Sequence, residues 1–129
     1  MSIHVEAHLP SELYKTTLRS PDGKEWIADE PADKGGKNLG PSPQELLASS
    51  LASCTSITLK MYLQHKAWLH GHIKVSVDLL PGSPVQFVSR IRIEGDFTVE
   101  QQNRLMHVAK ACPVHKILSS DCQIHTEFT

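Results

Sequence analysis

The sequence lacks an excess of charge of either sign. Its 129 residues include 13 Lys and Arg against 14 Asp and Glu, which leaves a formal net charge of −1. A domain that binds nucleic acid normally shows a basic excess or a basic stripe. We therefore expect no nucleic-acid partner.

The sequence also lacks a long hydrophobic run. The main uncharged stretch, residues 46–59, contains several serines and is bounded by Glu45 and Lys60. A membrane helix needs about 20 predominantly apolar residues, so we expect no membrane span. No basic segment followed by an apolar one opens the chain, so we also expect no secretory signal and a cytoplasmic location. The length favours one domain, residues 1–129.

Cysteine is scarce, with only Cys54, Cys112 and Cys122. An odd number without a secretory signal argues against a disulfide framework. The three cysteines are therefore core residues, metal ligands, or redox and nucleophilic groups. Cys112 and Cys122 each precede a histidine by three residues, at His115 and His125, but no Cys-x-x-Cys pair accompanies them. We expect no metal site on this pattern.

Two enzyme classes find little support. A Cys–His hydrolase with His115 or His65 as its base has no family-specific nucleophile signature. The glycines Gly35, Gly36 and Gly40 lack the strand, turn, helix and lysine of a phosphate-binding loop. We therefore expect no nucleotide cofactor.

The first third of the chain favours extended structure. Alternation in residues 3–7, threonine-rich residues 13–19 and residues 24–29 predict three strands. The turn Ser20–Gly23 joins the last two, because proline presets φ and glycine accepts a positive φ. Residues 29–40 are expected to form a loop.

A capping box predicts the start of a long helix. Ser42 serves as N-cap, Pro43 takes the first helical position, and Glu45 reaches back to the cap amide. No breaker follows before Gly71, so the helix should span about 24 residues. Its expected apolar face consists of Leu47, Leu51, Cys54, Thr58 and Met61. Many of the other residues are small, which favours burial of this helix within the molecule or a dimer.

The remainder predicts two strands, two helices and a last strand. Residues 73–79 and 87–93 alternate around a proline-rich turn, and Thr98 opens a helix in which Leu105, Val108 and Ala109 face inward. Pro113 ends that helix at Cys112, a short helix follows over residues 114–119, and residues 122–128 alternate as a final strand. This order indicates an α+β fold.

The local environments of Cys112 and Cys54 favour ionisation to different degrees. Cys112 stands at the N-cap position of the short helix, where the helix dipole stabilises a thiolate. Cys54 lies about three turns inside the long helix, where core packing is the commoner role. The hydroxyls of Ser50, Ser53, Thr55 and Thr58 nevertheless surround its sulfur in the sequence. Both interpretations of each cysteine stay open on these grounds.

Two cysteine motifs resemble those of the OsmC/Ohr superfamily, the osmotically inducible and organic-hydroperoxide-resistance group. The similar segments are residues 29–31, 35–36, 40–47, 53–55, 61–62 and 111–116. The resemblance implies a bacterial, cytoplasmic protein with antiparallel sheets around a long central helix, in an interlocked homodimer. It implies redox sites at the dimer interface, where Cys54 attacks a small hydroperoxide in oxidative-stress defence. Cys112 would then resolve the sulfenic acid as a disulfide, and a dithiol reductant of lipoyl or thioredoxin type would reopen it. Cys122 would be a packing residue in the last strand.

The sequence departs from the peroxidase pattern beside the helix-start proline. The peroxidase members carry a glutamate there, paired with an arginine from the N-terminal strands, whereas this chain has Gln44. Glu45 lies one residue later, about 100° around the helix, and Arg19 is the only arginine before Arg90. The candidate supporting residues are Arg19, Gln44, Glu45 and His115. The alternative function is a non-enzymatic dimer that binds small molecules or senses redox state with the same cysteines.

Overall fold

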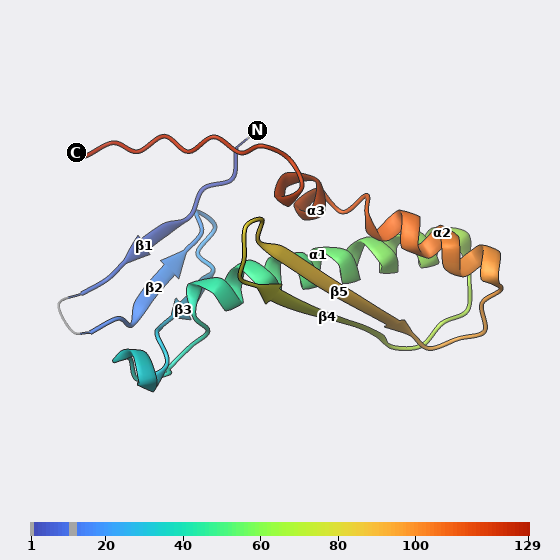
Figure 1. Ribbon diagram of the computed structural model, residues 1–129, viewed down its shortest axis with the longest axis horizontal. Coiled ribbons are helices and arrows are strands. Elements are labelled where there is room, and N and C mark those ends of the chain that lie inside the picture. The colour runs from blue at the N-terminus through green and yellow to red at the C-terminus, as the bar shows by residue number, and fades with distance from the viewer. Residues whose placement is uncertain (1, 11–12) are drawn as a thin grey trace. The chain divides into compact units, whose positions relative to one another are not determined.

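The computed structural model describes residues 2–10 and 13–129 (Figure 1). The chain forms two compact units, one up to Leu47 and one from Ala48 to Thr129. The first unit contains a three-stranded sheet, and the second contains a two-stranded sheet with helices. The α+β class expected from the sequence is confirmed.

The sheet of the first unit is an antiparallel meander. Its strands are β1 (Glu6–His8), β2 (Thr16–Arg19) and β3 (Glu25–Ala28), in the order β1-β2-β3. Gly23 has a φ of 91° in the β2–β3 turn, and its N–H bonds to the carbonyl of Ser20 at 3.1 Å. The three predicted strands are therefore present, each shorter than expected, and the predicted first strand begins later than residue 3.

A buried carboxylate organises the loop that follows β3. Asp29 accepts hydrogen bonds from the N–H groups of Glu30 at 2.7 Å and Leu39 at 3.2 Å. Between them the chain makes a short 3-10 helix, η1 (Ala32–Lys34). A Cβ at Gly36 would lie 2.0 Å from the carbonyl oxygen of Glu30, so only glycine fits there. The loop thereby closes on itself and leads directly to the long helix.

The long helix α1 (Pro43–Lys66) begins at the predicted capping box. The N–H of Glu45 bonds to Oγ of Ser42 at 3.2 Å, and the N–H of Ser42 bonds back to the Glu45 carboxylate at 3.0 Å. By length and composition alone α1 could cross a membrane. Leu59 and Leu63, however, are fully buried among other side chains of the second unit.

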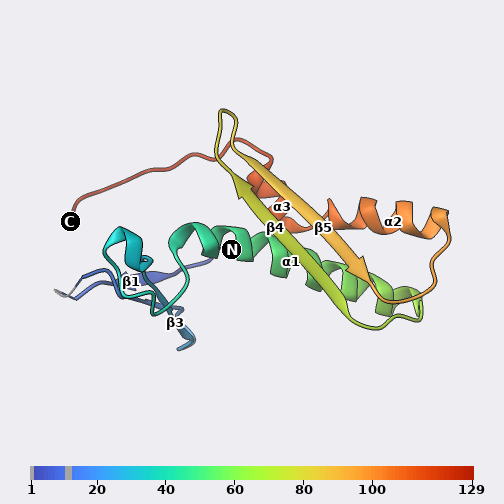
Figure 2. The ribbon, with the colours of Figure 1, turned by 60° about the horizontal axis from the view of Figure 1, so that its bottom comes forward.

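The second unit surrounds the C-terminal part of α1 with a hairpin and two further helices. These elements are β4 (Ile73–Leu80), β5 (Gln86–Ile93), α2 (Val99–Ala109) and α3 (Pro113–Leu118). Figure 2 shows the β4–β5 hairpin lying across α1 and α2. The predicted hairpin is confirmed, and so is the capping box of Thr98 and Gln101. The core consists of Leu59, Leu63, Leu105, Val108 and Ala109.

The buried stripe of α1 is not the predicted one. Leu51, Thr55, Leu59 and Leu63 are the buried residues of this helix, four positions apart. Leu47 and Met61, which the expected apolar face included, are 42% and 65% exposed. Both stripes satisfy helical spacing, and the packing of α2 and the hairpin against one side selects between them.

The prediction of a last strand over residues 122–128 is wrong in this chain. Residues 121–129 have no regular secondary structure, and Ile124 and Phe128 are almost fully exposed. Alternation supplies a face for a strand, but a strand also needs a neighbouring edge for its backbone hydrogen bonds. Cys122 is exposed too, so its expected role as a packing residue is also wrong.

Candidate active site

Two cysteines that are 58 residues apart in the sequence lie in contact in the second unit. Cys54 is half-buried in α1, and Cys112 is fully buried at the N-cap of α3. Both thiols are free, and the S–H of Cys54 donates a hydrogen bond to Sγ of Cys112. A disulfide between these two cysteines would join α1 to the start of the short helix α3.

The cap position of Cys112 gives its sulfur backbone donors. Pro113 occupies the first position of α3, and the N–H of His115 donates to Sγ of Cys112 at 3.4 Å. The N–H of Val114 and the hydroxyl of Thr55 also donate to this sulfur. Amide and hydroxyl donors stabilise an anion more than a neutral thiol.

The balance of these effects lowers the pKa of Cys112. Burial opposes ionisation of this thiol, but hydrogen bonds from Cys54, His115, Val114 and Thr55 favour the thiolate and outweigh burial. This agrees with the local sequence analysis, which favoured Cys112 as the more activated cysteine because of its N-cap position.

The pKa of Cys54 moves in the opposite direction. Burial raises it first, and the hydrogen bond that Cys54 donates to Cys112, together with the negative charge of that partner, raises it further. The N–H of Val114 and the hydroxyl of Thr58 act against this rise without reversing it. Of the two thiols, Cys54 therefore ionises less readily than Cys112.

The candidate supporting residues have identifiable positions. In the first unit, Nε of Arg19 on β2 donates to the carboxylate of Glu25 on β3 at 3.1 Å. Glu45 is held in the capping box, and Gln44 is exposed in the first turn of α1. His115 contributes its backbone N–H to the cysteine pair. The carboxylate of Glu45 thus has the structural role that its spacing predicted.

The threonine hydroxyls near Cys54 were visible in the sequence, but their distribution between the sulfurs was not. Thr58 donates to Cys54 because it lies one turn later on the same helix, whereas Thr55 donates to Cys112. The shared Val114 amide was missed altogether, because a backbone donor leaves no signature in residue types.

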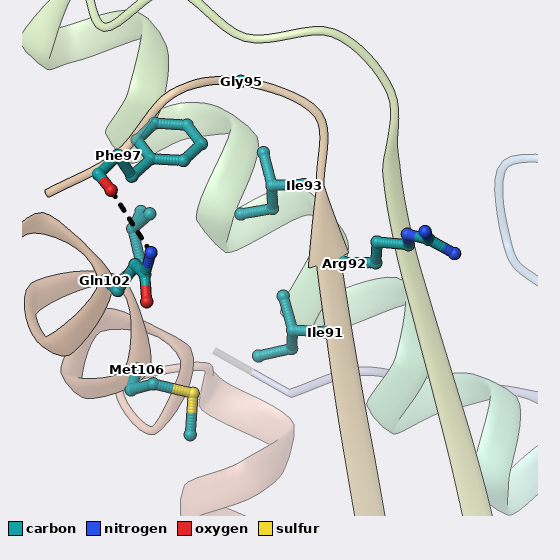
Figure 3. A pocket seen from close by; sticks show the side chains of 8 residues that line it. Ile91, Arg92, Ile93, Gly95, Phe97, Gln102 and Met106 are labelled. Atoms are coloured by element: carbon teal, nitrogen blue, oxygen red, sulfur yellow. Dashed lines mark hydrogen bonds between the residues drawn. The ribbon is translucent and has the colours of Figure 1, made fainter. Parts of the chain in front are cut away.

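Other features of the described chain lie apart from the cysteine pair. Among residues 2–10 and 13–129, no three His, Cys, Asp or Glu side chains cluster as metal ligands would. A cavity of about 350 Å³ lies between β5 and α2 (Figure 3), lined mainly by apolar side chains such as Ile91 and Phe97. In it Gln102 donates to the carbonyl of Phe97 at 3.2 Å, and Arg92 points away. No cysteine lines this cavity.

An α+β chain that brings two free thiols together has the groups that thiol–disulfide exchange requires. Comparison with known proteins makes this more specific, because residues 35–127 match the family model of the OsmC-like proteins. The chain belongs to this family, and the matched region includes both Cys54 and Cys112. The resemblance noted in the sequence is thereby confirmed. No curated protein matches the chain.

Several solved structures share the fold. A Psychrobacter arcticus protein linked by name to osmotic stress and detoxification has a TM-score of 0.76 and 24% identity, covering 91% of this chain and 88% of its own. The organic hydroperoxide resistance protein OsmC of Legionella pneumophila has a TM-score of 0.64 and 15% identity, covering 92% and 90%. OhrB of Bacillus subtilis, also an organic hydroperoxide resistance protein, has a TM-score of 0.59 and 21% identity, covering 94% and 93%. The chain thus shares the fold of these proteins.

Proposed function

We propose that this protein reduces small organic hydroperoxides with the Cys54–Cys112 pair. The observation that carries the proposal is the contact between two free thiols of unequal exposure. Cys54 is the partly exposed one and so the one that a peroxide reaches, while Cys112 is fully buried behind it. Membership of a family related to hydroperoxide resistance supports the same chemistry.

The proposed reaction has three steps. The sulfur of Cys54 attacks one oxygen of the hydroperoxide, the O–O bond breaks, and an alcohol leaves while Cys54 becomes a sulfenic acid. Sγ of Cys112 then attacks that sulfur, forming a disulfide and releasing water. A dithiol of lipoyl or thioredoxin type next reduces the disulfide and is itself oxidised to a disulfide.

The proposed function includes a homodimeric state of the protein. On α1, Ile57 and Met61 are 55% and 65% exposed in the single chain. Ser49 and Ser53 are also exposed and small, so a second helix could approach closely. Light scattering at micromolar concentration should give twice the 14.3 kDa mass of one chain, and the mass of a monomer would contradict the proposed dimer.

Peroxidase activity is tested by the consumption of tert-butyl hydroperoxide with dihydrolipoamide as reductant. The Cys54→Ser variant should lose consumption completely, because serine lacks a nucleophile of comparable strength. Cys122→Ser is the matched control, since this thiol is exposed and donates to the backbone carbonyls of Ile117 at 3.4 Å and Ser120 at 3.9 Å. An unchanged rate in Cys54→Ser would contradict the proposal.

A second candidate function is redox sensing without useful turnover. The raised pKa of Cys54 favours it, because a protonated thiol reacts slowly with peroxide. This function predicts that one equivalent of hydroperoxide forms the Cys54–Cys112 disulfide, seen by mass spectrometry of peptides, while dithiol reductants fail to support repeated turnover. Multiple turnovers with a dithiol would exclude sensing as the sole function.

A further inference from the structure

We propose that the cavity between β5 and α2 binds an uncharged, mainly hydrocarbon compound that carries one hydroxyl group. The cavity lies in the second unit, and its walls come from β5, from the loop after this strand and from α2 (Figure 3). Neither Cys54 nor Cys112 lines it. The proposal therefore goes beyond the peroxidase function and does not depend on it.

Hydrocarbon forms most of the wall of this cavity. Ile91 and Ile93 extend from β5 on the side of the core, and Phe97 comes from the loop that joins β5 to α2 (Figure 3). On α2, Leu105 is 6% exposed and Met106 is 53% exposed, which gives the cavity a buried floor and an accessible rim. Walls of this kind favour a ligand whose apolar surface leaves water on binding.

The volume of the cavity sets the size of the ligand. It is about 350 Å³, whereas an apolar cavity of roughly 150 Å³ is enough to accept benzene. Ligand pockets in proteins begin at about 300 Å³. A hydrocarbon chain of about eight carbons therefore fits the available space.

The electrostatic environment of the cavity excludes a charged ligand. Arg92 is the one charged side chain among the described residues of the lining, and its guanidinium points away from the cavity (Figure 3). A carboxylate or an ammonium group placed inside would lose its hydration without gaining a partner of opposite charge, which costs free energy. The chemistry of the wall therefore selects an uncharged compound.

One side-chain amide gives the cavity a polar contact. Nε2 of Gln102 donates to the carbonyl of Phe97 at 3.2 Å, and this bond fixes the orientation of the amide. Oε1 of Gln102 points the other way, toward Met106 (Figure 3). An amide oxygen accepts hydrogen bonds and cannot donate them. It therefore matches a ligand hydroxyl, which can donate.

Gly95 holds one end of the cavity in place. Its φ of 148° favours glycine, and a Cβ at this position would lie 3.0 Å from Cε2 and Cζ of the Phe97 ring. The Phe97 ring also lies near the Trp68 ring, with 6.4 Å between the ring centroids. A wall that is ordered before a ligand arrives lowers the entropic cost of binding.

Octanol is the probe, and isotope labelling of the methionine methyl groups reports by NMR where it binds. Met106 lines the cavity, whereas Met61 lies on α1 outside it. Titration with octanol should shift the Met106 methyl signal to saturation and leave the Met61 signal unchanged. The proposal is overturned by a Met106 signal that does not shift to saturation, or by a Met61 shift of equal size.

A charged probe tests the selection for an uncharged ligand. Octanoate has the same number of carbons as octanol but carries a carboxylate at neutral pH. Isothermal titration of the unmodified protein should show octanoate binding at least about tenfold more weakly than octanol. Equal or tighter binding of octanoate would contradict the proposal. This comparison needs no variant, so it does not depend on how well a variant folds.

Two substitutions on α2 test the position of the ligand. Met106→Trp adds bulk at the rim and should weaken octanol binding by at least about tenfold. Val99→Trp is the matched control, because Val99 is 72% exposed on the same helix and does not line the cavity. Gln102→Leu removes the acceptor and should weaken octanol binding by about fivefold, as expected for one neutral hydrogen bond. Equal affinities of Met106→Trp and Val99→Trp would overturn the proposal.

Discussion

Helices α1 and α3 begin with the same arrangement of atoms. In each, the cap residue precedes a proline, and the N–H three residues later donates to the cap side chain. The acceptor is Oγ of Ser42 for α1, at 3.2 Å, and Sγ of Cys112 for α3, at 3.4 Å. The two cap side chains differ in one atom, an oxygen in Ser42 and a sulfur in Cys112.

That difference separates a structural cap from a reactive one. The Ser42 hydroxyl stays neutral, and the Glu45 carboxylate completes a reciprocal box around it. At the matching position α3 has His115 and no carboxylate, so no negative charge competes there with a thiolate. A motif that stabilises one helix thus also favours ionisation of a thiol in the other.

Exchange of the α3 cap atom should have the largest effect on activity. Cys112→Ser preserves an N-cap acceptor but removes the thiolate and the disulfide partner. Hydroperoxide turnover with dihydrolipoamide should fall by on the order of 100-fold or more, while the α1 control Ser42→Ala keeps its turnover. Equal losses in both variants would show that only helix stability matters.

Removal of the cap side chain should lower the stability of the protein more at α3 than at α1. Ser42→Ala should lower the free energy of unfolding by about 1 kcal/mol, the usual value of a cap. Cys112→Ala should cost about 2 kcal/mol, because it also leaves a cavity at a fully buried position. Urea unfolding of the two reduced variants gives the comparison, and a smaller loss at Cys112 would contradict it.

Oxidation should affect one helix start and spare the other. A Cys54–Cys112 disulfide replaces the Cys112 thiol, whose lowered pKa favours the charged form, with a neutral sulfur at the His115 N–H. Amide exchange at His115 should then speed up by about fivefold, equivalent to about 1 kcal/mol of cap strength. Hydrogen exchange of Glu45, whose N–H bonds to Ser42, provides the internal control and should not change on oxidation.

Substitution within the α1 box should have the smallest effect. Glu45→Gln keeps a side-chain acceptor for the Ser42 amide, so the free energy of unfolding should fall by no more than about 0.5 kcal/mol. Peroxide consumption should be unchanged, because the carboxylate has a structural role. A large loss of activity with normal stability would place Glu45 in the reaction instead.

Much of the fold follows from short-range patterns. The starts of α1 and α2, the β2–β3 turn and the β4–β5 hairpin were predictable because caps, turn residues and alternation act over a few residues. Residues 122–128 show the limit of such patterns, since their alternation is strong and yet no strand forms in this chain.

The candidate site was also only partly predictable from the sequence. The motifs around Cys54 and Cys112 singled out both residues, and the N-cap position favoured Cys112 as the acidic thiol. The opposite pKa shifts of the two thiols could not be predicted, because they depend on Thr55, Thr58 and the Val114 amide meeting two sulfurs from different helices.

The sequence by itself determined the α+β class, the family, the helix starts and the identity of the two cysteines. Each depends on residue types at fixed spacing, and neighbouring residues are sufficient to specify it. Only the tertiary structure decided which stripe of α1 is buried and which of the three cysteines makes no sulfur pair. It also decided that the pKa of Cys112 is lowered while that of Cys54 is raised, because hydrogen bonding and burial depend on groups that folding brings together from distant parts of the chain.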